Sequence, residues 1–301
     1  MGGRSFPFIY NKKTIEMKIC KTVQEIRDAA AAEKRSGKTI ACVPTMGYLH
    51  EGHLSLVAKA KEVADVVIVT LFVNPTQFSP NEDFASYPRD FEHDASLCSA
   101  AGADYLFAPS EKEMYPAGYQ TGVCVKGVSE LFEGSFRPIH FNGVATVVAK
   151  LFIATKADYA VFGQKDYQQT LVVRQMARDL LLGVKIIVAP IKREESGLAR
   201  SSRNTYLTAQ QKEDATILSK TLKLAEKAIR GGMTSKTEID KLMKENLEKQ
   251  GSCVGKIDYA SAVMAEDLSS PSEFKKGDKI VLLLAVYVGK VRLIDNMIIE
   301  I

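Results

Sequence analysis

Runs of apolar, mostly β-branched residues alternate with helical patterns through the first two-thirds of this chain. The run at residues 66–73, Val-Val-Ile-Val-Thr-Leu-Phe-Val, is typical of a strand buried on both faces of a sheet. Strands that alternate with helices pair in parallel through right-handed crossovers. The pattern therefore predicts a doubly wound, Rossmann-like α/β sheet over residues 1–189, with ligands bound at the carboxyl ends of its strands. The expected strands are 39–43, 66–73, 105–108, 159–162 and 184–189, and the expected helices are 50–60, 90–101, 143–154 and 168–181.

The pattern changes in the last third of the chain, where long helical stretches come before strand-like ones. Runs of helices followed by runs of strands are typical of α+β domains. The sequence therefore predicts a smaller C-terminal α+β domain over residues 190–301. Its expected elements are helices at 208–230 and 236–250, with a Gly-Gly break between them, and strands at 257–264 and 279–294, the second interrupted by Gly289.

The segment 44–53, Pro-Thr-Met-Gly-Tyr-Leu-His-Glu-Gly-His, joins the first expected strand to the helix that follows. The unpaired N–H groups of a helix start attract phosphate. His50 and His53 are three residues apart, so on a helix they share one face, and Gly52 lets a nucleotide lie against the backbone. By itself an H-x-x-H pair is more often structural. A zinc site is disfavoured, because the remaining two histidines show no ligand spacing and no cysteine pair lies near.

Two polar segments follow other expected strands. Asn74 and Gln77 offer amides to hydroxyl or carboxylate groups, although the same residues also suit an ordinary Asn-Pro turn. Further along, Gly163 permits close backbone approach and Lys165 can reach a phosphate. Asp166 suits either a helix cap or a contact to a ribose hydroxyl.

Two loops complete the set of candidate site segments. Ser201, Ser202 and Arg203 place two hydroxyls beside a guanidinium, which fits a mobile clamp on a triphosphate or a solvated linker. The polar, proline-bearing loop at 81–90 is a candidate lid or an ordinary surface loop. The joint position of these segments at successive strand ends favours nucleotide chemistry.

The net charge, the cysteines and the absence of long apolar stretches argue against several classes of protein. A formal net charge of +4 without a basic tract argues against a dedicated nucleic-acid binder. Five scattered cysteines show no disulfide framework, so a reducing cytoplasm is the simplest setting. No stretch reaches the ~20 apolar residues of a membrane span. Residues 1–16 lack a signal-peptide pattern, and because Met17 suits a natural start, they read as a leader or an extension.

These motifs together resemble the pantothenate synthetase (pantoate–β-alanine ligase) family. The likeness runs from about Met17 to the end of the chain, and the H-x-G-H element is shared with other nucleotidyl transferases and class I aminoacyl-tRNA synthetases. The F-V-N-P-T-Q-F and G-Q-K-D-Y-Q-Q stretches are more specific to this family. The stretches that carry the resemblance are 44–53, 72–78, 87–89, 163–169, 201–204 and 292–296.

The resemblance implies an H-x-G-H nucleotidyl transferase type of Rossmann-like domain and a two-step reaction. ATP adenylates the carboxylate of (R)-pantoate and releases pyrophosphate, and β-alanine then attacks the pantoyl adenylate to give pantothenate and AMP. Mg²⁺ is expected to arrive on the ATP phosphates, with no protein ligand named, and the family implies a homodimer. The alternatives are another H-x-G-H nucleotidyl transferase that acts on a phosphorylated acceptor, a class I synthetase, or a non-catalytic nucleotide-binding module.

The resemblance also implies roles for particular residues. His53 is the expected proton donor, and His50, Lys165 and Arg203 are expected to stabilise charge on the phosphates. Arg200 departs from the apolar residue usual at its position in the family. The implied pantoate contacts are Gln77, Gln169 and Asn74, and the implied ATP contacts are Met46, Gly47, His50, Gly52, His53, Gly163, Gln164, Lys165, Asp166, Ser201, Ser202 and Arg203.

Overall fold

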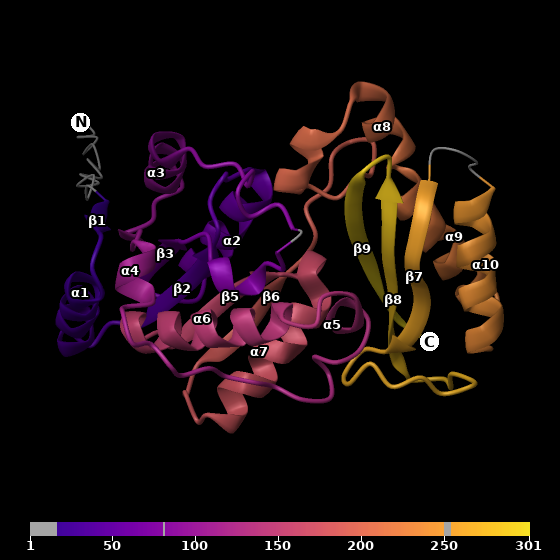
Figure 1. Cartoon of the computed structure of the whole chain (residues 1–301). Coiled ribbons are helices and arrows are strands. Elements are labelled where there is room, and N and C mark those ends of the chain that lie inside the picture. The colour runs from indigo at the N-terminus through magenta and orange to yellow at the C-terminus, as the bar shows by residue number, and fades with distance from the viewer. Residues whose placement is uncertain (1–16, 81, 250–253) are drawn as a thin grey trace, which may run out of the picture.

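The structure, a computed structural model, describes residues 17–80, 82–249 and 254–301, so the expectations for residues 1–16 lie outside it. Figure 1 shows two parts side by side, an α/β part built on a parallel sheet and a C-terminal part built on an antiparallel sheet. The predicted fold class is confirmed. Strand β6 ends at Ala189, and the division into 1–189 and 190–301 stays a prediction.

Among the described residues the first sheet has six strands in the order β1-β4-β3-β2-β5-β6, all of them parallel. β2 lies between β3 and β5, so the chain builds the sheet first to one side of β2 and then to the other. The crevice at such a switch point is the usual ligand site of doubly wound sheets. The strands are β1 (Lys18–Cys20), β2 (Ile40–Thr45), β3 (Val66–Leu71), β4 (Tyr105–Phe107), β5 (Tyr159–Gly163) and β6 (Lys185–Ala189).

Helices cover both faces of this sheet. One apolar cluster packs α1, α6 and α7 on one face, and a second packs α2 and α3 on the other. These helices and the short ones between them are α1 (Val23–Arg35), α2 (Glu51–Lys61), α3 (Phe91–Ala100), α4 (Glu111–Met114), α5 (Glu133–Phe136), α6 (His140–Thr155) and α7 (Tyr167–Asp179), with 3₁₀ turns η1 (Pro75–Gln77) and η2 (Gln164–Asp166).

The C-terminal part packs helices against an antiparallel sheet of the order β7-β8-β9. Its sheet also meets the α/β part directly, because Tyr167 and Leu171 of α7 pack against Val263, Val281 and Leu283. Its elements are η3 (Ser202–Tyr206), α8 (Ala209–Asp214), α9 (Ile217–Arg230), α10 (Lys236–Glu248), β7 (Val254–Met264), β8 (Lys279–Val288) and β9 (Val291–Glu300).

The predicted boundaries need corrections. The helix expected at 208–230 is two helices, because the N–H and hydroxyl of Thr216 both donate to the carbonyl of Glu213, at 3.1 and 2.7 Å, and tighten the chain into a turn. The helix expected to begin at Gly143 begins at His140. The interruption at Gly289 is confirmed as a hairpin turn, where φ is +59°. In the ranges described, no helix is long and apolar enough to cross a bilayer.

Candidate functional site

A cavity of about 220 Å³ lies at the carboxyl ends of β2 and β5, next to the loop that leads into the C-terminal part. It brings together most of the residues that the sequence singled out. Gly47 and Gln164 do not line it, and the Gln164 amide instead donates to Asn296 at 3.1 Å. The predicted residues that line the cavity are Met46, His50, Gly52, His53, Asn74, Gln77, Gly163, Lys165, Asp166, Gln169, Ser201, Ser202 and Arg203.

A buried carboxylate on α3 holds the loop between β2 and α2. Asp94 is 1% exposed, and its two oxygens accept the N–H groups of Tyr48 and Leu49 at 2.8 and 2.6 Å. The loop needs this support, because Gly47 (φ +86°) and Tyr48 (φ +50°) both lie in the left-handed region, which is costly for tyrosine. Burial raises the pKa of Asp94, and the two N–H groups oppose that rise. Sequence reasoning missed Asp94, since it is far from the loop along the chain.

The two histidines of the motif present hydrogen-bond donors to the cavity. His50 is the N-cap of α2 and not part of the helix, so the expected shared helix face is wrong, yet the two rings lie 4.2 Å apart. His50 Nδ1 accepts the N–H of Gly52 at 3.1 Å, and His53 Nδ1 accepts the N–H of His50 at 3.3 Å. A neutral imidazole whose Nδ1 accepts must carry its hydrogen on Nε2. Both rings therefore offer an Nε2–H group.

The same histidines are neutral at physiological pH. Burial lowers the pKa of His50 to about 4, with Lys165 and Arg200 contributing in the same direction. Burial and the neighbouring His50 lower the pKa of His53 to about 3. A neutral imidazole with its hydrogen on Nε2 can donate to a phosphate oxygen without first gaining a proton, so the pair suits charge stabilisation over a wide pH range.

The segment after β5 forms the 3₁₀ turn η2, which places Lys165 in the cavity. Asn296 of β9 holds this turn, because its side-chain amide donates to the carbonyls of Gln164 and Lys165, each at 2.9 Å. Lys165 Nζ is 3.7 Å from the Asp166 carboxylate. The helix-cap interpretation of Asp166 is wrong, because its side chain makes no cap hydrogen bond to α7.

The serine–arginine loop is folded against the α/β part and is not a solvated linker. Ser202 is buried, and Ser201 Oγ accepts the N–H of Arg203 at 3.3 Å. The Arg203 guanidinium makes a two-pronged ion pair with Asp83, at 3.0 and 3.2 Å. Arg200, the departure from the family pattern, pairs with Glu51 at the start of α2 at 2.9 Å. The loop thus contacts both the described part of the candidate lid, at Asp83, and the start of α2, at Glu51.

The amide pair predicted at the end of β3 is almost fully buried. Asn74 is 1% exposed and Gln77 is 7% exposed. Asn74 Nδ2 donates to Gln77 Oε1 at 3.0 Å, and Gln77 Nε2 points at Met46 Sδ, 3.0 Å away. The Asn-Pro turn that the sequence also suggested is present as η1, with Asn74 as its N-cap, and it brings the two amides together beside the cavity.

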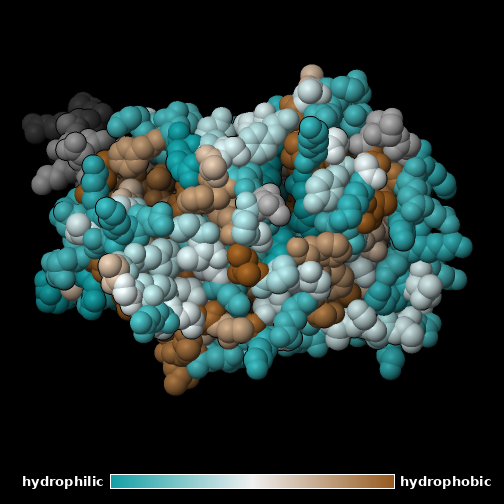
Figure 2. Space-filling model, in the orientation of Figure 1, coloured by the Kyte–Doolittle hydropathy of each residue, from teal (hydrophilic) through white to brown (hydrophobic). Residues whose placement is uncertain are grey.

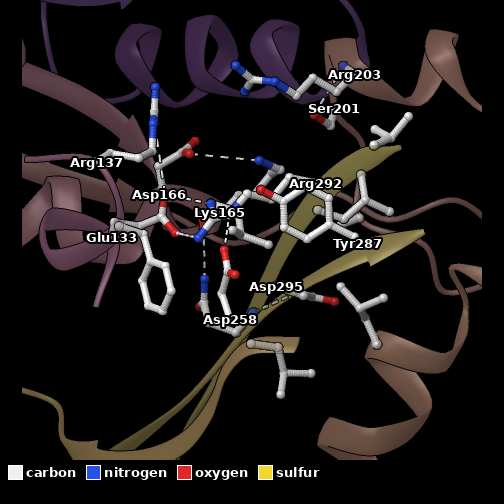
Figure 3. A pocket seen from close by; sticks show the side chains of 18 of the residues that line it. Glu133, Arg137, Lys165, Asp166, Ser201, Arg203, Asp258, Tyr287, Arg292 and Asp295 are labelled. Carbon is white, nitrogen blue, oxygen red and sulfur yellow. Dashed lines mark hydrogen bonds and ion pairs between the residues drawn. The ribbon is translucent and has the colours of Figure 1, made fainter. Parts of the chain in front are cut away.

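A second cavity of about 420 Å³ lies between the α/β part and the C-terminal sheet, and shares Lys165, Asp166 and Gln169 with the first. Figure 2 shows a hollow with hydrophilic surroundings between the two parts. Figure 3 shows Glu133 beside Arg292, whose Nη2 lies 2.6 Å from Glu133 Oε1. This ion pair joins α5 to β9 and was not predicted as part of the site.

Two further residues that sequence reasoning left out line both cavities. Arg137 Nε and Nη2 donate to Glu82 at 2.6 and 2.9 Å. His140 Nδ1 lies 3.1 Å from the carbonyl of Gln77 and so must donate to it. Burial, followed by the nearby Arg137 charge, lowers the pKa of His140 to about 4. Sequence reasoning missed His140 because it shows no metal-ligand spacing to another histidine. Its hydrogen-bond partner is a backbone carbonyl, which no sequence motif marks.

The donor set around the cavity does not form a protein-held metal cage. Within the described ranges, no group of three or more His, Cys, Asp or Glu side chains could hold a metal ion. Of the described residues that line the smaller cavity, Asp166 alone is acidic. Mg²⁺ commonly binds through one or two carboxylates and the phosphates of its nucleotide, so these residues fit an ion that comes with ATP.

Comparison with known proteins identifies the family of this chain. The family model described as pantoate-beta-alanine ligase matches residues 18–298. The pantothenate synthetase of Acetivibrio thermocellus is 47% identical over 95% of this chain and 100% of its own length, and that of Caldicellulosiruptor bescii is 48% identical over 94% and 99%.

Solved structures agree with the sequence relatives. The crystal structure of pantothenate synthetase from Thermus thermophilus matches with a TM-score of 0.86 at 44% identity, over 93% of this chain and 99% of that one. A Francisella tularensis pantoate–β-alanine ligase, complexed with β-γ ATP and β-alanine, matches with a TM-score of 0.76 at 35% identity, over 93% and 97%. From the family model and from relatives that align along nearly their whole length, the chain belongs to the pantoate–β-alanine ligase family.

Proposed function

We propose that the 220 Å³ cavity is the place where this ligase makes and consumes its acyl adenylate. The enzyme condenses (R)-pantoate with β-alanine, at the expense of ATP, through a pantoyl adenylate, and releases AMP and pyrophosphate. A free carboxylate is a poor acyl donor because its leaving group would be oxide, whereas the adenylate can expel AMP. The cavity must therefore align the pantoate carboxylate with the α-phosphate and stabilise the pyrophosphate as it departs.

The observation that carries this proposal is the convergence of two neutral donors and one cation on a single cavity. His50 and His53 offer Nε2–H groups, and Lys165 reaches the same space from η2. Negative charge that develops on the leaving pyrophosphate would meet all three. We assign His53 as the donor to the transferring phosphate, with His50 and Lys165 as the neighbouring charge stabilisers.

Arg203, Ser201 and Ser202 are proposed to hold the remaining phosphate oxygens. In this structure the Arg203 guanidinium already binds a carboxylate, that of Asp83. A phosphate, like a carboxylate, can accept two parallel N–H···O bonds from a guanidinium, so ATP would compete with Asp83 for this side chain. Exchange of one anion for the other would couple nucleotide binding to the loop at 81–90.

Gln77 and Gln169 are proposed to bind pantoate, with Asn74 behind them. Both glutamines line the cavity, Gln77 from η1 and Gln169 from the first turn of α7. In the second half-reaction the β-alanine amine attacks the pantoyl carbonyl: the C–N bond forms, the bond between the carbonyl carbon and the AMP phosphate oxygen breaks, and the nitrogen gives up one proton to water. The Francisella tularensis relative bound to β-γ ATP and β-alanine supports this pair of co-substrates.

Mg²⁺, the homodimer and the cytoplasmic location are further parts of the proposal. Mg²⁺ would be held by the phosphates, with Asp166 as the acidic side chain among the described residues that line the cavity, and would supply charge neutralisation on them. The family resemblance supports a homodimer formed through the α/β part. Sedimentation of the purified chain at micromolar concentration tests the dimer, and a monomeric species there would refute it.

The assigned roles predict that the two half-reactions can be separated by mutation. Exchange of labelled pyrophosphate into ATP, in the presence of pantoate alone, measures adenylation. His53→Ala and Lys165→Ala should each slow this exchange about 100-fold, equivalent to ~3 kcal/mol for one lost charge-stabilising donor. Gln77→Ala should raise the KM for pantoate and leave the KM for ATP nearly unchanged.

His93→Ala provides a matched control. His93 is an exposed histidine of α3 that does not line the cavity, so its replacement should leave the exchange rate unchanged. Normal adenylation by His53→Ala would show that the assignment of His53 is wrong.

A further inference from the structure

A chain of hydrogen bonds runs from Tyr115 into the amide pair that faces the cavity. Tyr115 directly follows the short helix α4, and its hydroxyl lies 2.7 Å from Asn74 Oδ1. Asn74 in turn donates to Gln77, the residue assigned above to pantoate. Tyr115 itself does not line the cavity, so these hydrogen bonds are the route by which its hydroxyl can affect a substrate.

The hydrogen-bond partners of Asn74 determine which end of its side-chain amide is the oxygen and which is the NH₂ group. The carbonyl of Gly143 lies 3.1 Å from one end of the Asn74 amide, and since a carbonyl only accepts, that end must be the NH₂ group. The other end is then the oxygen, which accepts from the hydroxyls of Tyr115 and Thr76 at 2.7 and 3.0 Å. The Asn74 amide is thereby fixed in one orientation.

The fixed asparagine imposes an orientation on Gln77. Because Asn74 donates to it, the nearer end of the Gln77 amide is the oxygen Oε1. The end that remains for the cavity is Nε2, whose one hydrogen-bond partner among the described residues is Met46 Sδ at 3.0 Å, a weak acceptor. Gln77 can therefore donate to a substrate oxygen but cannot accept from a substrate N–H or O–H group.

The ring of Tyr115 is held so that its hydroxyl stays on Asn74. It packs edge-on against Tyr119, with centroids 5.0 Å apart, and lies 6.2 Å from Phe72. The Lys150 ammonium sits 4.6 Å from the Tyr115 centroid and 4.2 Å from that of Tyr119. Burial raises the pKa of Tyr115, so its hydroxyl keeps the proton that it donates.

We propose that Tyr115 is a positioning residue for pantoate: its hydroxyl, together with that of Thr76 and the Gly143 carbonyl, holds the Asn74 amide in one orientation, which makes Gln77 a pure hydrogen-bond donor to the substrate. This inference rests on the proposed function of Gln77. It predicts selection for a substrate that presents an oxygen acceptor, a carboxylate or a hydroxyl oxygen, at the Gln77 position. An analogue of pantoate with an ammonium group there would leave both donors unpaired.

Tyr115→Phe removes the hydroxyl and keeps the ring. The KM for pantoate should rise about tenfold, the usual worth of one buried neutral hydrogen bond. The KM for ATP and the kcat at saturating pantoate should stay within about twofold. Tyr119→Phe is the matched control, because Tyr119 shares the same ring stack and lysine, and its hydroxyl makes no hydrogen bond to the described residues. It should behave like the unmodified enzyme.

A double-mutant comparison separates this inference from the function on which it depends. If Tyr115 acts through Gln77, then Tyr115→Phe should change the pantoate KM of Gln77→Ala by less than about twofold. Three results would overturn the positioning role. The first is a further tenfold rise of the pantoate KM when Tyr115→Phe is added to Gln77→Ala, and the second is an unchanged pantoate KM in Tyr115→Phe alone. The third is a Tyr115→Phe enzyme whose kcat falls by the same factor as its KM values for pantoate and for ATP rise. An unchanged pantoate KM in Gln77→Ala would instead overturn the assignment of Gln77 and this inference with it.

Discussion

Replacement of Gly143 by alanine sets two physical effects against each other at the contact between α6 and η1. In an ordinary helix interior this change stabilises by about 1 kcal/mol, because alanine restricts the unfolded chain more than glycine. At this position, however, a Cβ atom would lie 2.4 Å from the Thr76 oxygen, 2.5 Å from its carbonyl carbon and 2.6 Å from Gln77 Cα. All three are backbone atoms, so no side chain can rotate away.

The steric overlap of the new Cβ atom should outweigh the gain in helix propensity. Contacts below 3.0 Å require η1 to move outward by roughly 0.6 Å or more, and forced overpacking of this kind costs about 1–3 kcal/mol. The shift also strains two hydrogen bonds, from Asn74 Nδ2 to the Gly143 carbonyl and from His140 Nδ1 to the Gln77 carbonyl, each worth about 1 kcal/mol. After the helix-propensity gain is subtracted, we expect a net destabilisation of about 2 kcal/mol.

Urea unfolding and steady-state kinetics measure the two consequences. Gly143→Ala should lower the free energy of unfolding by about 2 kcal/mol and raise the pantoate KM at least tenfold, because Gln77 moves with η1. Asn142→Ala, one residue earlier on the exposed side of α6, gains helix propensity without a clash and should be slightly stabilising. A Gly143→Ala protein that is at least as stable as the parent, with the same pantoate KM, would refute this reasoning.

Two other predictions follow from buried groups of the site. Asp94→Asn replaces one acceptor oxygen by an NH₂ group that faces a backbone N–H, so it should destabilise the protein by about 2 kcal/mol. It should also weaken ATP binding, which titration calorimetry measures. An unchanged ATP affinity would contradict the role of Asp94. The pKa values of His50, His53 and His140 are lowered to about 4, 3 and 4, so between pH 6.5 and 4 the unfolded chain binds more protons than the folded one. Stability should therefore fall as the pH falls through this window, by a few kcal/mol at pH 5, and equal urea midpoints at pH 7 and pH 5 would contradict it.

The sheet and the outline of the site were predictable because their signals are local. A buried run such as 66–73 shows its strand character within a few residues, and parallel pairing then brings the strand ends to one edge. That geometry explains why His53, Gln77 and Lys165, far apart along the chain, line one cavity. The N-terminal helix α1 also has a local signal that sequence analysis passed over, a capping box between Thr22 and Glu25.

The supporting residues were not predictable, because their partners are distant or are backbone groups. Asp94 stabilises a loop 45 residues before it, and nothing in its neighbourhood distinguishes it from an ordinary helix-start acid. Tyr115 reaches Asn74 across 41 residues of chain. The pairing of Arg203 with Asp83 spans 120 residues, so the sequence shows a free cationic loop where the fold has an ion pair.

Pantoate-dependent release of pyrophosphate from ATP, measured with and without β-alanine and followed by mass analysis of the product, tests the central claim most directly. We expect pyrophosphate release as soon as pantoate is added, and pantothenate only when β-alanine is also present. Pyrophosphate release that does not depend on pantoate would contradict the proposed chemistry of the cavity.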